Sequence, residues 1–397
     1  MPDPMPNKIS AVLLGLCLLT VTFAVNLQAP LYNAYAAQGD VGAAAVTIAF
    51  AAYVAGLMPT LLFLGGLSNR VGRRPPIIAA LILGAAATGL LIIWPNWTTL
   101  IIARAILGVG TGLATTAGTA YMNELLGCDR AKGAALAVTS ATSLGFGGGA
   151  LATGISLGMQ GPTLFPASFA ILLVLAPCLV FAAIFLPRTD SDADAPLLRR
   201  PLFPKGTGIF GLSLALAWSV TGMTIAVVPL QLVRNNLGGW SGLVIFLAIF
   251  TGFLCQPIAK RLTNNAALAV GLFLVPTGFV ILLIGMRFDL LAAVLAGTCI
   301  TSAASYGFTY LAALAEVSAR APDDRARATA GLFIYAYVGF SVPVIISGIL
   351  ADTLGLLPAM ALFGATTIAA TMAIVMRLKR LAIAISARSG QGRQTAG

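Results

Sequence analysis

Residues 65–75 read GGLSNRVGRRP and form a short polar segment between two long apolar runs. Three arginines, Arg70, Arg73 and Arg74, lie here beside glycines that favour a turn. Apolar runs of about 20 residues are long enough to cross a bilayer as helices. The segment therefore predicts a tight turn between two membrane-spanning helices, on the side of the membrane that collects positive charge.

The composition extends this interpretation to the whole chain of 397 residues, which is 59% hydrophobic and only 9% charged. Inside a bilayer only helices and closed barrels satisfy the backbone, and a barrel would need short alternating segments. The apolar runs here are continuous. We expect an all-α membrane protein in contact with the lipid bilayer, and the Ala- and Gly-rich composition favours a multi-pass protein of a bacterial inner (plasma) membrane.

Several classes of function find no support in the sequence. The net charge of +11 comes from basic residues that flank apolar runs, so we expect no nucleic-acid partner. There is no histidine, and five cysteines are scattered without a CxxC spacing, so we expect no metal and no cofactor. A membrane-bound enzyme or sensor would need a carboxylate pair, a metal cluster or a soluble domain, and none is visible. We predict that the protein is not an enzyme.

The apolar runs predict twelve transmembrane helices. They cover approximately 9–34, 42–66, 76–95, 98–123, 132–158, 163–186, 207–233, 240–259, 266–286, 290–315, 326–350 and 357–377. Nearly all of the 23 Lys and Arg residues fall in segments on one side, whereas the other side holds only Arg234 and Arg287. Because basic loops stay in the cytoplasm, both termini are predicted to be cytoplasmic.

The two halves of the chain resemble each other. Val21-Thr22 and Pro30 recur as Val220-Thr221 and Pro229, and further pairs recur at nearly the same separation. This predicts two pseudo-symmetric six-helix bundles, the architecture of alternating-access carriers with a site between them. The predicted organisation is a bundle at 1–187, a cytoplasmic linker at 188–206, a second bundle at 207–380 and a disordered cytoplasmic tail at 381–397.

The segment 65–75 resembles the loop of the major facilitator superfamily, whose pattern is G-x-L-(A/S)-D-R-x-G-R-(R/K). The matching residues are Gly65, Leu67, Ser68, Arg70, Gly72, Arg73 and Arg74. The departure is Asn69, since the family usually has an aspartate there, as part of a charge cluster that holds the cytoplasmic side closed. Asn69 accepts hydrogen bonds but forms no ion pair. Glu124, at the end of the fourth span, is expected either to supply this charge to Arg70 or Arg73, or to be a solvated helix end.

Two further patterns are similar to those of transporters in this family. Arg104, followed by Gly108 and Gly110, resembles a motif of proton-coupled carriers; the arginine is expected to face a cavity, the alternative being an extended side chain that reaches the outer surface. Gly145 and Gly149 resemble the antiporter motif, with Phe146 where proline is usual, or form a plain packing surface. The expected gating residues are Gly65, Asn69, Arg70, Gly72, Arg73, Arg74, Glu124, Gly145 and Gly149.

No carboxylate lies in the middle of a predicted span, so cationic substrates are disfavoured, and Arg104 favours neutral or anionic ones. Polar and aromatic side chains in the spans are candidates for binding, although ordinary packing is the alternative for each aromatic. The predicted substrate-binding residues are Asn26, Gln28, Tyr32, Arg104, Thr111, Trp218, Ser302, Tyr306 and Tyr335.

The resemblance implies a secondary active transporter for a small-molecule substrate. We expect a monomer that carries out proton-coupled efflux (antiport) of neutral or anionic amphipathic compounds by alternating access. The alternative is a facilitator or importer of an anionic metabolite that uses Arg104 as the counter-charge.

Overall fold

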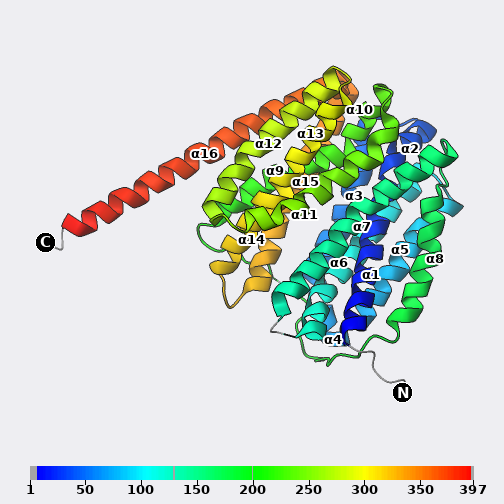
Figure 1. Ribbon diagram of the computed structural model, residues 1–397, viewed down its shortest axis with the longest axis horizontal. Coiled ribbons are helices and arrows are strands. Elements are labelled where there is room, and N and C mark those ends of the chain that lie inside the picture. The colour runs from blue at the N-terminus through cyan, green and yellow to red at the C-terminus, as the bar shows by residue number, and fades with distance from the viewer. Residues whose placement is uncertain (1–6, 128–129, 199, 395–397) are drawn as a thin grey trace.

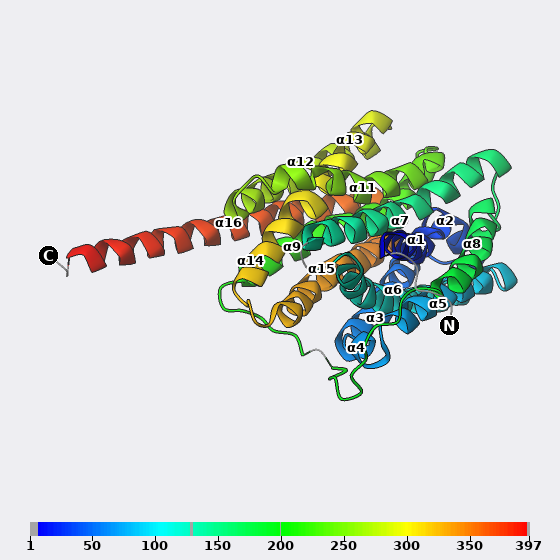
Figure 2. The same ribbon diagram turned by 60° about the horizontal axis from the view of Figure 1, so that its bottom comes forward.

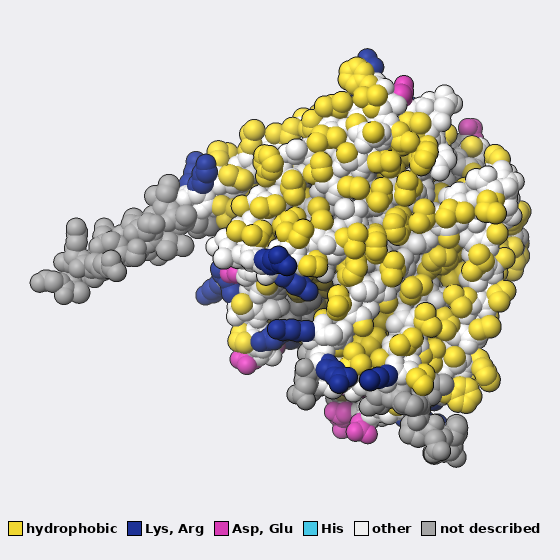
Figure 3. Space-filling view, in the orientation of Figure 1, with side chains coloured by type: hydrophobic (Ala, Val, Ile, Leu, Met, Phe, Trp, Pro, Cys, Tyr) yellow, Lys and Arg dark blue, Asp and Glu magenta, His cyan; other side chains and the backbone are white. Residues whose placement is uncertain are grey.

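The computed structural model describes residues 7–127, 130–198 and 200–394, and these form a helical bundle without strands (Figure 1). Within the described residues, eleven helices are long and apolar enough to span a membrane, and the shorter apolar helix α8 (Ala167–Ala183) completes the predicted twelve. Large apolar side chains such as Val174 and Phe273 are exposed, as contact with lipid requires. In the face shown in Figure 3, hydrophobic side chains cover the body and basic ones gather mainly along the lower edge.

Apart from α16, which continues well beyond its predicted span, the helices follow the predicted spans to within a few residues. The first bundle consists of α1 (Asn7–Asn26), η1 (Ala29–Leu31), α2 (Tyr32–Gly39), α3 (Ala43–Phe63), α4 (Leu67–Val71), α5 (Arg74–Ile93), α6 (Trp97–Leu126), α7 (Ala131–Gln160) and α8. The second consists of α9 (Gly208–Ala226), α10 (Val228–Arg234), η3 (Gly238–Trp240), α11 (Ser241–Ala259), α12 (Asn264–Arg287), α13 (Leu291–Ser302), η4 (Ala303–Thr309), α14 (Tyr310–Ala319), α15 (Arg325–Leu354) and α16 (Leu356–Gln394).

The first and seventh spans are each broken at the same place. The helix α1 ends at Asn26 just before Pro30, and α9 ends at Ala226 just before Pro229. Proline has no N–H to donate to the preceding turn, so each helix restarts at the proline as a shorter one. The pair of breaks occupies the positions that the internal repeat matched.

The molecule has two distinct ends, the linker end and the far end. The linker end carries α4 and the segment between the bundles, which runs past α4 in Figure 2. The far end carries α2, α10 and the start of α3. Between the bundles, α3 packs against α15 and α7 packs against α11. Beyond the bundle, α16 continues as a helix to Gln394 and projects away from it, where the sequence predicted a disordered tail from 381 (Figure 1).

Candidate functional site

The polar segment 65–75 folds around the short helix α4, between Gly66 and Gly72. Gly72 has a φ of +84°, a conformation that favours glycine, and it ends α4. The amide of Gly66 donates a hydrogen bond of 3.0 Å to the carbonyl oxygen of Leu197 in the linker. A Cβ atom on Gly66 would overlap the carbonyl of Pro196, so this glycine allows the turn and the linker to touch.

Arg73 connects the turn to the end of α6. Its Nε lies 2.8 Å from Oε1 of Glu124, and its Nη1 donates to Ser68 Oγ at 2.9 Å and to Asn69 Oδ1. The ion pair that the sequence suggested for Glu124 is therefore present, with Arg73 as the partner. Asn69 accepts a hydrogen bond in place of the missing carboxylate, and Glu124 supplies the negative charge.

The two neighbouring arginines of the turn donate to backbone carbonyl oxygens rather than to carboxylates. Arg70 Nε donates to the carbonyl oxygen of Ala193 at 2.6 Å, and Arg74 Nη1 donates to that of Ile184, also at 2.6 Å. From the second bundle, Arg327 Nε donates to the carbonyl oxygen of Arg200 at 3.1 Å. The linker is thus hydrogen-bonded to both bundles.

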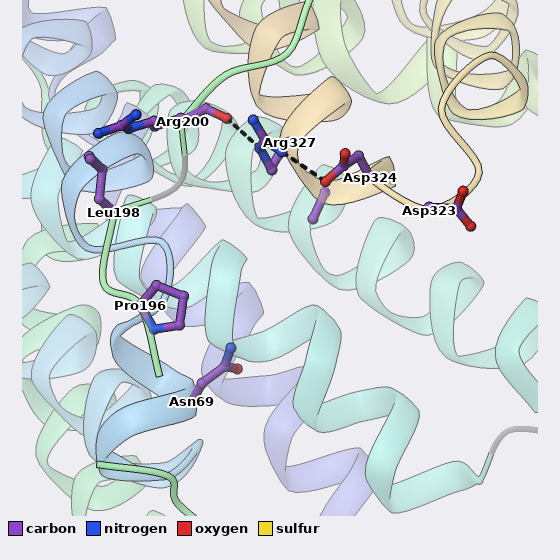
Figure 4. Close-up of a pocket in the computed structure, with 8 residues that line it drawn as sticks. Asn69, Pro196, Leu198, Arg200, Asp323, Asp324 and Arg327 are labelled. Atoms are coloured by element: carbon purple, nitrogen blue, oxygen red, sulfur yellow. Dashed lines mark hydrogen bonds and ion pairs between the residues drawn. The ribbon is translucent and has the colours of Figure 1, made fainter. Parts of the chain in front are cut away.

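A pocket of about 560 Å³ lies between the bundles at the linker end (Figure 4). On one side are Asn69 of α4 and the linker, and on the other is the turn that leads into α15, with Arg327 paired to Asp324 at 3.1 Å. Of the three ion pairs among the described residues, each joins side chains of one bundle. The pocket is lined by Asn69, Pro196, Leu198, Arg200, Asp323, Asp324, Ala326 and Arg327.

At the far end the two bundles touch. Asn33 Nδ2 of α2 donates to the carbonyl oxygen of Pro229 in α10 at 3.1 Å. A Cβ atom on Gly154 of α7 would lie 3.1 Å from the Cα of Gly242 in α11, so the two backbones meet there. The structure is therefore closed between the bundles at the far end, and the pocket separates them at the linker end.

The glycines of α7 pack on two sides. A Cβ on Gly145 would overlap Thr22 Oγ1, and one on Gly149 would overlap the carbonyl of Phe23, so both allow α1 to approach within its own bundle. A Cβ on Gly147 would lie 2.9 Å from the ring of Phe246 in the second bundle. The glycines that we expected in gating thus form a close contact between α1 and α7.

Arg104 is buried, with 1% of its surface exposed, and does not reach the outer surface. Its Nη1 donates to the carbonyl oxygen of Val25 at 2.6 Å, and its Nη2 donates to that of Phe50 at 3.3 Å. Its Cζ lies 4.9 Å from the ring centroid of Tyr53, a cation–π distance. Arg104 Nε has no hydrogen-bond partner. The guanidinium thus binds carbonyls and aromatic faces between α1, α3 and α6.

The other candidates of the first bundle lie close to the break in α1, and all are buried. Asn26 Nδ2 donates to the carbonyl oxygen of Phe146 at 2.8 Å, and Gln28 Nε2 donates to that of Val25 at 2.8 Å. Thr111 Oγ1 bonds back to Leu107 of its own helix. These hydrogen bonds hold the backbone around the break in α1 and within α6 in place. Tyr32, in contrast, has a hydroxyl without a hydrogen-bond partner.

The second bundle contains an aromatic cluster around Trp218 of α9. The nearest ring centroids are those of Tyr337 at 5.3 Å and Tyr306 at 5.4 Å. Phe340, 6.0 Å from Trp218, also lies 4.8 Å from Phe50 in the first bundle. Trp218 is 6% exposed and its Nε1 has no partner. We define the aromatic cluster as Trp218, Tyr306, Tyr310, Phe333, Tyr337 and Phe340.

A π-helix carries part of this cluster. The segment η4 lies between α13 and α14, and the wider π turn is frequent at functional sites. Ser305 Oγ of this segment donates to the carbonyl oxygen of Ala217 in α9 at 2.8 Å. The bond fixes η4 against α9 one residue before Trp218, and Tyr306 then packs on the indole ring.

Ser302 and Tyr335 do not join the cluster. Ser302 Oγ accepts a hydrogen bond of 2.8 Å from the amide of Gly252 and holds α13 against α11. Tyr335 lies with its ring centroid 5.8 Å from that of Phe203, near the linker, and its ring covers Gly211. Of the nine predicted binding residues, the structure brings Trp218 and Tyr306 together in the aromatic cluster, and Arg104 and Gln28 together at the carbonyl oxygen of Val25.

Several residues that meet at this place were not among the predicted binding residues. Phe333, Tyr337 and Phe340 lie on one face of α15 at spacings of four and three, which is the signal that sequence reasoning could have used. Tyr310 follows Tyr306 by four residues. Phe50 and Tyr53 of α3 offered no such signal, because their partner Arg104 is distant in the sequence.

Two six-helix bundles that meet at one end and are separated by a pocket at the other have the architecture of a membrane transporter. Residues 14–342 match the model of the Major Facilitator Superfamily, and the chain belongs to this family. Members of the family are transporters and not enzymes, and the protein is accordingly a multi-pass protein of the inner membrane.

Two relatives of the chain are also described as transport or resistance proteins. The chain is 33% identical over 79 residues to "Multidrug resistance protein MdtL" of Shewanella sp. (strain ANA-3), covering 20% of each chain. It is 34% identical over 64 residues to "Inner membrane transport protein YnfM" of Escherichia coli (strain K12), covering 16% of this chain and 15% of that one. The matches thus span a fifth or less of these relatives.

Two solved structures share the fold over nearly the whole chain. The nucleoside transporter NupG has a TM-score of 0.74 at 12% identity, with 93% of this chain and 99% of that chain covered. A bacterial homologue of the human lysosomal transporter Spinster, in an inward-facing and unoccupied conformation, has a TM-score of 0.68 at 14% identity, with 94% and 96% covered.

Proposed function

We propose that this protein exports small organic solutes by alternating access, with protons moving in the opposite direction. The observation that carries the proposal is the asymmetry between the two ends: the bundles meet at Gly154 and Gly242 and are separated by the pocket beside Asn69. With the linker end in the cytoplasm, as the distribution of basic residues predicts, this is a cytoplasm-facing state.

The side chains of the interior support the proposed substrate class. The aromatic cluster offers a flat apolar surface, and Trp218 Nε1 is a buried donor without a hydrogen-bond acceptor. Arg104 contributes positive charge, and no Asp or Glu pairs with it in the part of the chain that is described. This environment favours neutral or anionic amphipathic compounds over cations. The matched stretch of a multidrug resistance protein supports efflux.

A reconstituted system tests the proposal directly. Proteoliposomes containing the protein would be offered neutral, anionic and cationic aromatic compounds, with and without an imposed pH gradient. We expect gradient-dependent movement of neutral or anionic compounds, abolished by a protonophore. Equal rates with and without the gradient would exclude proton coupling, and a preference for cations would exclude the proposed substrate class.

A second candidate is a facilitator or importer of an anionic metabolite. Two buried donors without partners support it, Arg104 Nε and the hydroxyl of Tyr32. If this candidate is right, organic anions stabilise the purified protein against heat, and Arg104→Ala removes that effect. Anion binding that is unchanged in Arg104→Ala would eliminate it. In either case we expect the protein to act as a monomer.

A further inference from the structure

Asp352, near the end of α15, caps a helix of the other bundle. Its Oδ1 accepts a hydrogen bond of 2.6 Å from the amide of Ala43, and its Oδ2 accepts one of 3.0 Å from the amide of Ala44. These amides belong to the first turn of α3, where helix N–H groups lack partners within the helix. A Cβ atom on Gly42 would overlap the carboxylate, so glycine at this position makes room for it.

The cap closes the far end of the molecule. It lies on the interface of α3 with α15, where Gly348 of α15 also packs directly on Thr47 of α3. A carboxylate at a helix N-terminus gains from the partial positive charge there as well as from its two hydrogen bonds. Asp352 thus contributes a charge-dependent contact between the bundles at the end that is closed.

Asp352 has no basic partner in the part of the chain that the structure describes. No Lys or Arg nitrogen of the described residues lies within ion-pair distance of it. None of the other charged or titratable side chains around this end hydrogen-bonds with Asp352: Tyr32 and Tyr35 of α2, Asp40 after α2, Arg234 of α10, and Arg287 and Asp289 at the end of α12. Among the described residues, the partners of this carboxylate are thus the two backbone N–H groups of α3.

We propose that Asp352 is a proton-sensitive latch that holds the far end closed when charged and releases it when protonated. A protonated carboxyl loses the charge that complements α3 and one of its acceptor sites. Because protons weaken the closed state, the open state takes up the proton more readily, and by linkage a lower pH at the far end shifts the equilibrium toward opening.

The inference rests on the proposed function and makes the opening of the far end depend on pH. No carboxylate lies mid-span, and at the linker end Asn69 stands where the family usually has a titratable acid. With the far end outside the cell, a proton taken from the acidic side would open the transporter outward and release the substrate. The far end closes again when Asp352 releases the proton to the same outer side, so the latch controls opening and does not itself carry a proton across the membrane.

A distance measurement tests the latch without substrate. Spin labels would be attached to Gln38→Cys of α2 and Gly239→Cys of η3, in a protein whose five native cysteines are replaced by serine. Gln38 is exposed, and a side chain at Gly239 meets nothing within 4 Å. We expect one short distance at about pH 7.5 and a growing longer one toward about pH 3.5, below the value of about 3.9 at which ordinary aspartates bind protons.

Three variants define the outcome. Asp352→Asn should lower the closed-to-open ratio about tenfold or more at neutral pH and remove the response to pH. Gly42→Ala should open the far end at neutral pH with Asp352 intact, which covers the case that Asp352→Asn fails to fold. Asp40→Asn, a neighbouring exposed aspartate whose left-handed backbone suits asparagine, should behave like the wild type.

The latch is wrong if the wild-type distances ignore pH, or if Asp352→Asn still responds. The result is separable from that of the transport assay, since no substrate or gradient is used. Labels that separate at low pH in a protein whose transport ignores a pH gradient would retain the latch and reject proton antiport.

Discussion

Arg104 and Val25 are joined across α6 and α1 by a hydrogen bond of 2.6 Å, from Nη1 to the carbonyl oxygen. The bond falls one residue before α1 ends, where Gln28 also donates to the same oxygen. The buried guanidinium therefore holds the broken first span in place, whatever solute the protein carries.

This relationship predicts a strong effect on stability. Arg104→Ala removes a fully buried side chain and leaves a cavity, and we expect the free energy of unfolding to fall by about 2–5 kcal/mol. Arg104→Lys, which keeps the charge but fits fewer carbonyls, should lose less. Thermal unfolding followed by intrinsic fluorescence measures both, with the exposed Arg287→Ala as the control. A wild-type transition in Arg104→Ala would contradict the structural role.

The contact between α1 and α7 predicts a position-specific response to one methyl group. Gly145→Ala and Gly149→Ala place a Cβ on Thr22 Oγ1 and on the backbone of Phe23, so each should destabilise the protein by about 1–3 kcal/mol. Gly158→Ala, on the same helix with nothing within 4 Å, is the matched control and should be neutral or slightly stabilising. Equal midpoints for all three in a thermal-shift assay would refute the close packing.

The ion pair at the linker end predicts a small coupling. Arg73 and Glu124 are 16% and 41% exposed, so solvent screens their attraction, and a double-mutant cycle should give about 0.2–1 kcal/mol. Arg73→Gln, Glu124→Gln and the double variant would be compared by denaturant unfolding. A coupling near zero would show that Asn69 and Ser68 suffice to hold Arg73.

The aromatic cluster is the predicted binding site for an aromatic solute. Once a ligand is found, Trp218→Phe should weaken its binding by about tenfold, because the ring area is reduced and the indole donor is lost. Trp94→Phe, which alters an exposed tryptophan outside the cluster, should leave affinity unchanged. Titration by fluorescence or calorimetry distinguishes them, and equal affinities in both variants would place the binding site elsewhere.

Much of the fold could be predicted because its signals are local. The length of each apolar run set the spans, and the paired prolines, Pro30 and Pro229, marked both breaks since proline removes a backbone donor. The ion pair of Glu124 with this turn was also foreseeable, because the turn has three arginines and no acid of its own.

The site was harder to predict. Tyr335 and Tyr337 are two residues apart on α15, but successive helical residues are about 100° apart, so they face different neighbours. The hydropathy of a span that is apolar all round does not say which face meets α9. The carbonyls that receive Arg104 belong to helices distant in sequence, and the cap formed by Asp352 depends on how the two bundles meet.

The π-helix η4 has a consequence for how the sequence of such a chain can change during evolution. A π turn holds one residue more than an α turn, so deletion of one residue within 303–309 would restore the α pattern. Everything before the deletion would then be rotated by about 100° relative to α14. A single-residue length change inside this span is thus a route to a new set of side chains facing the interior, with every loop left at its present length.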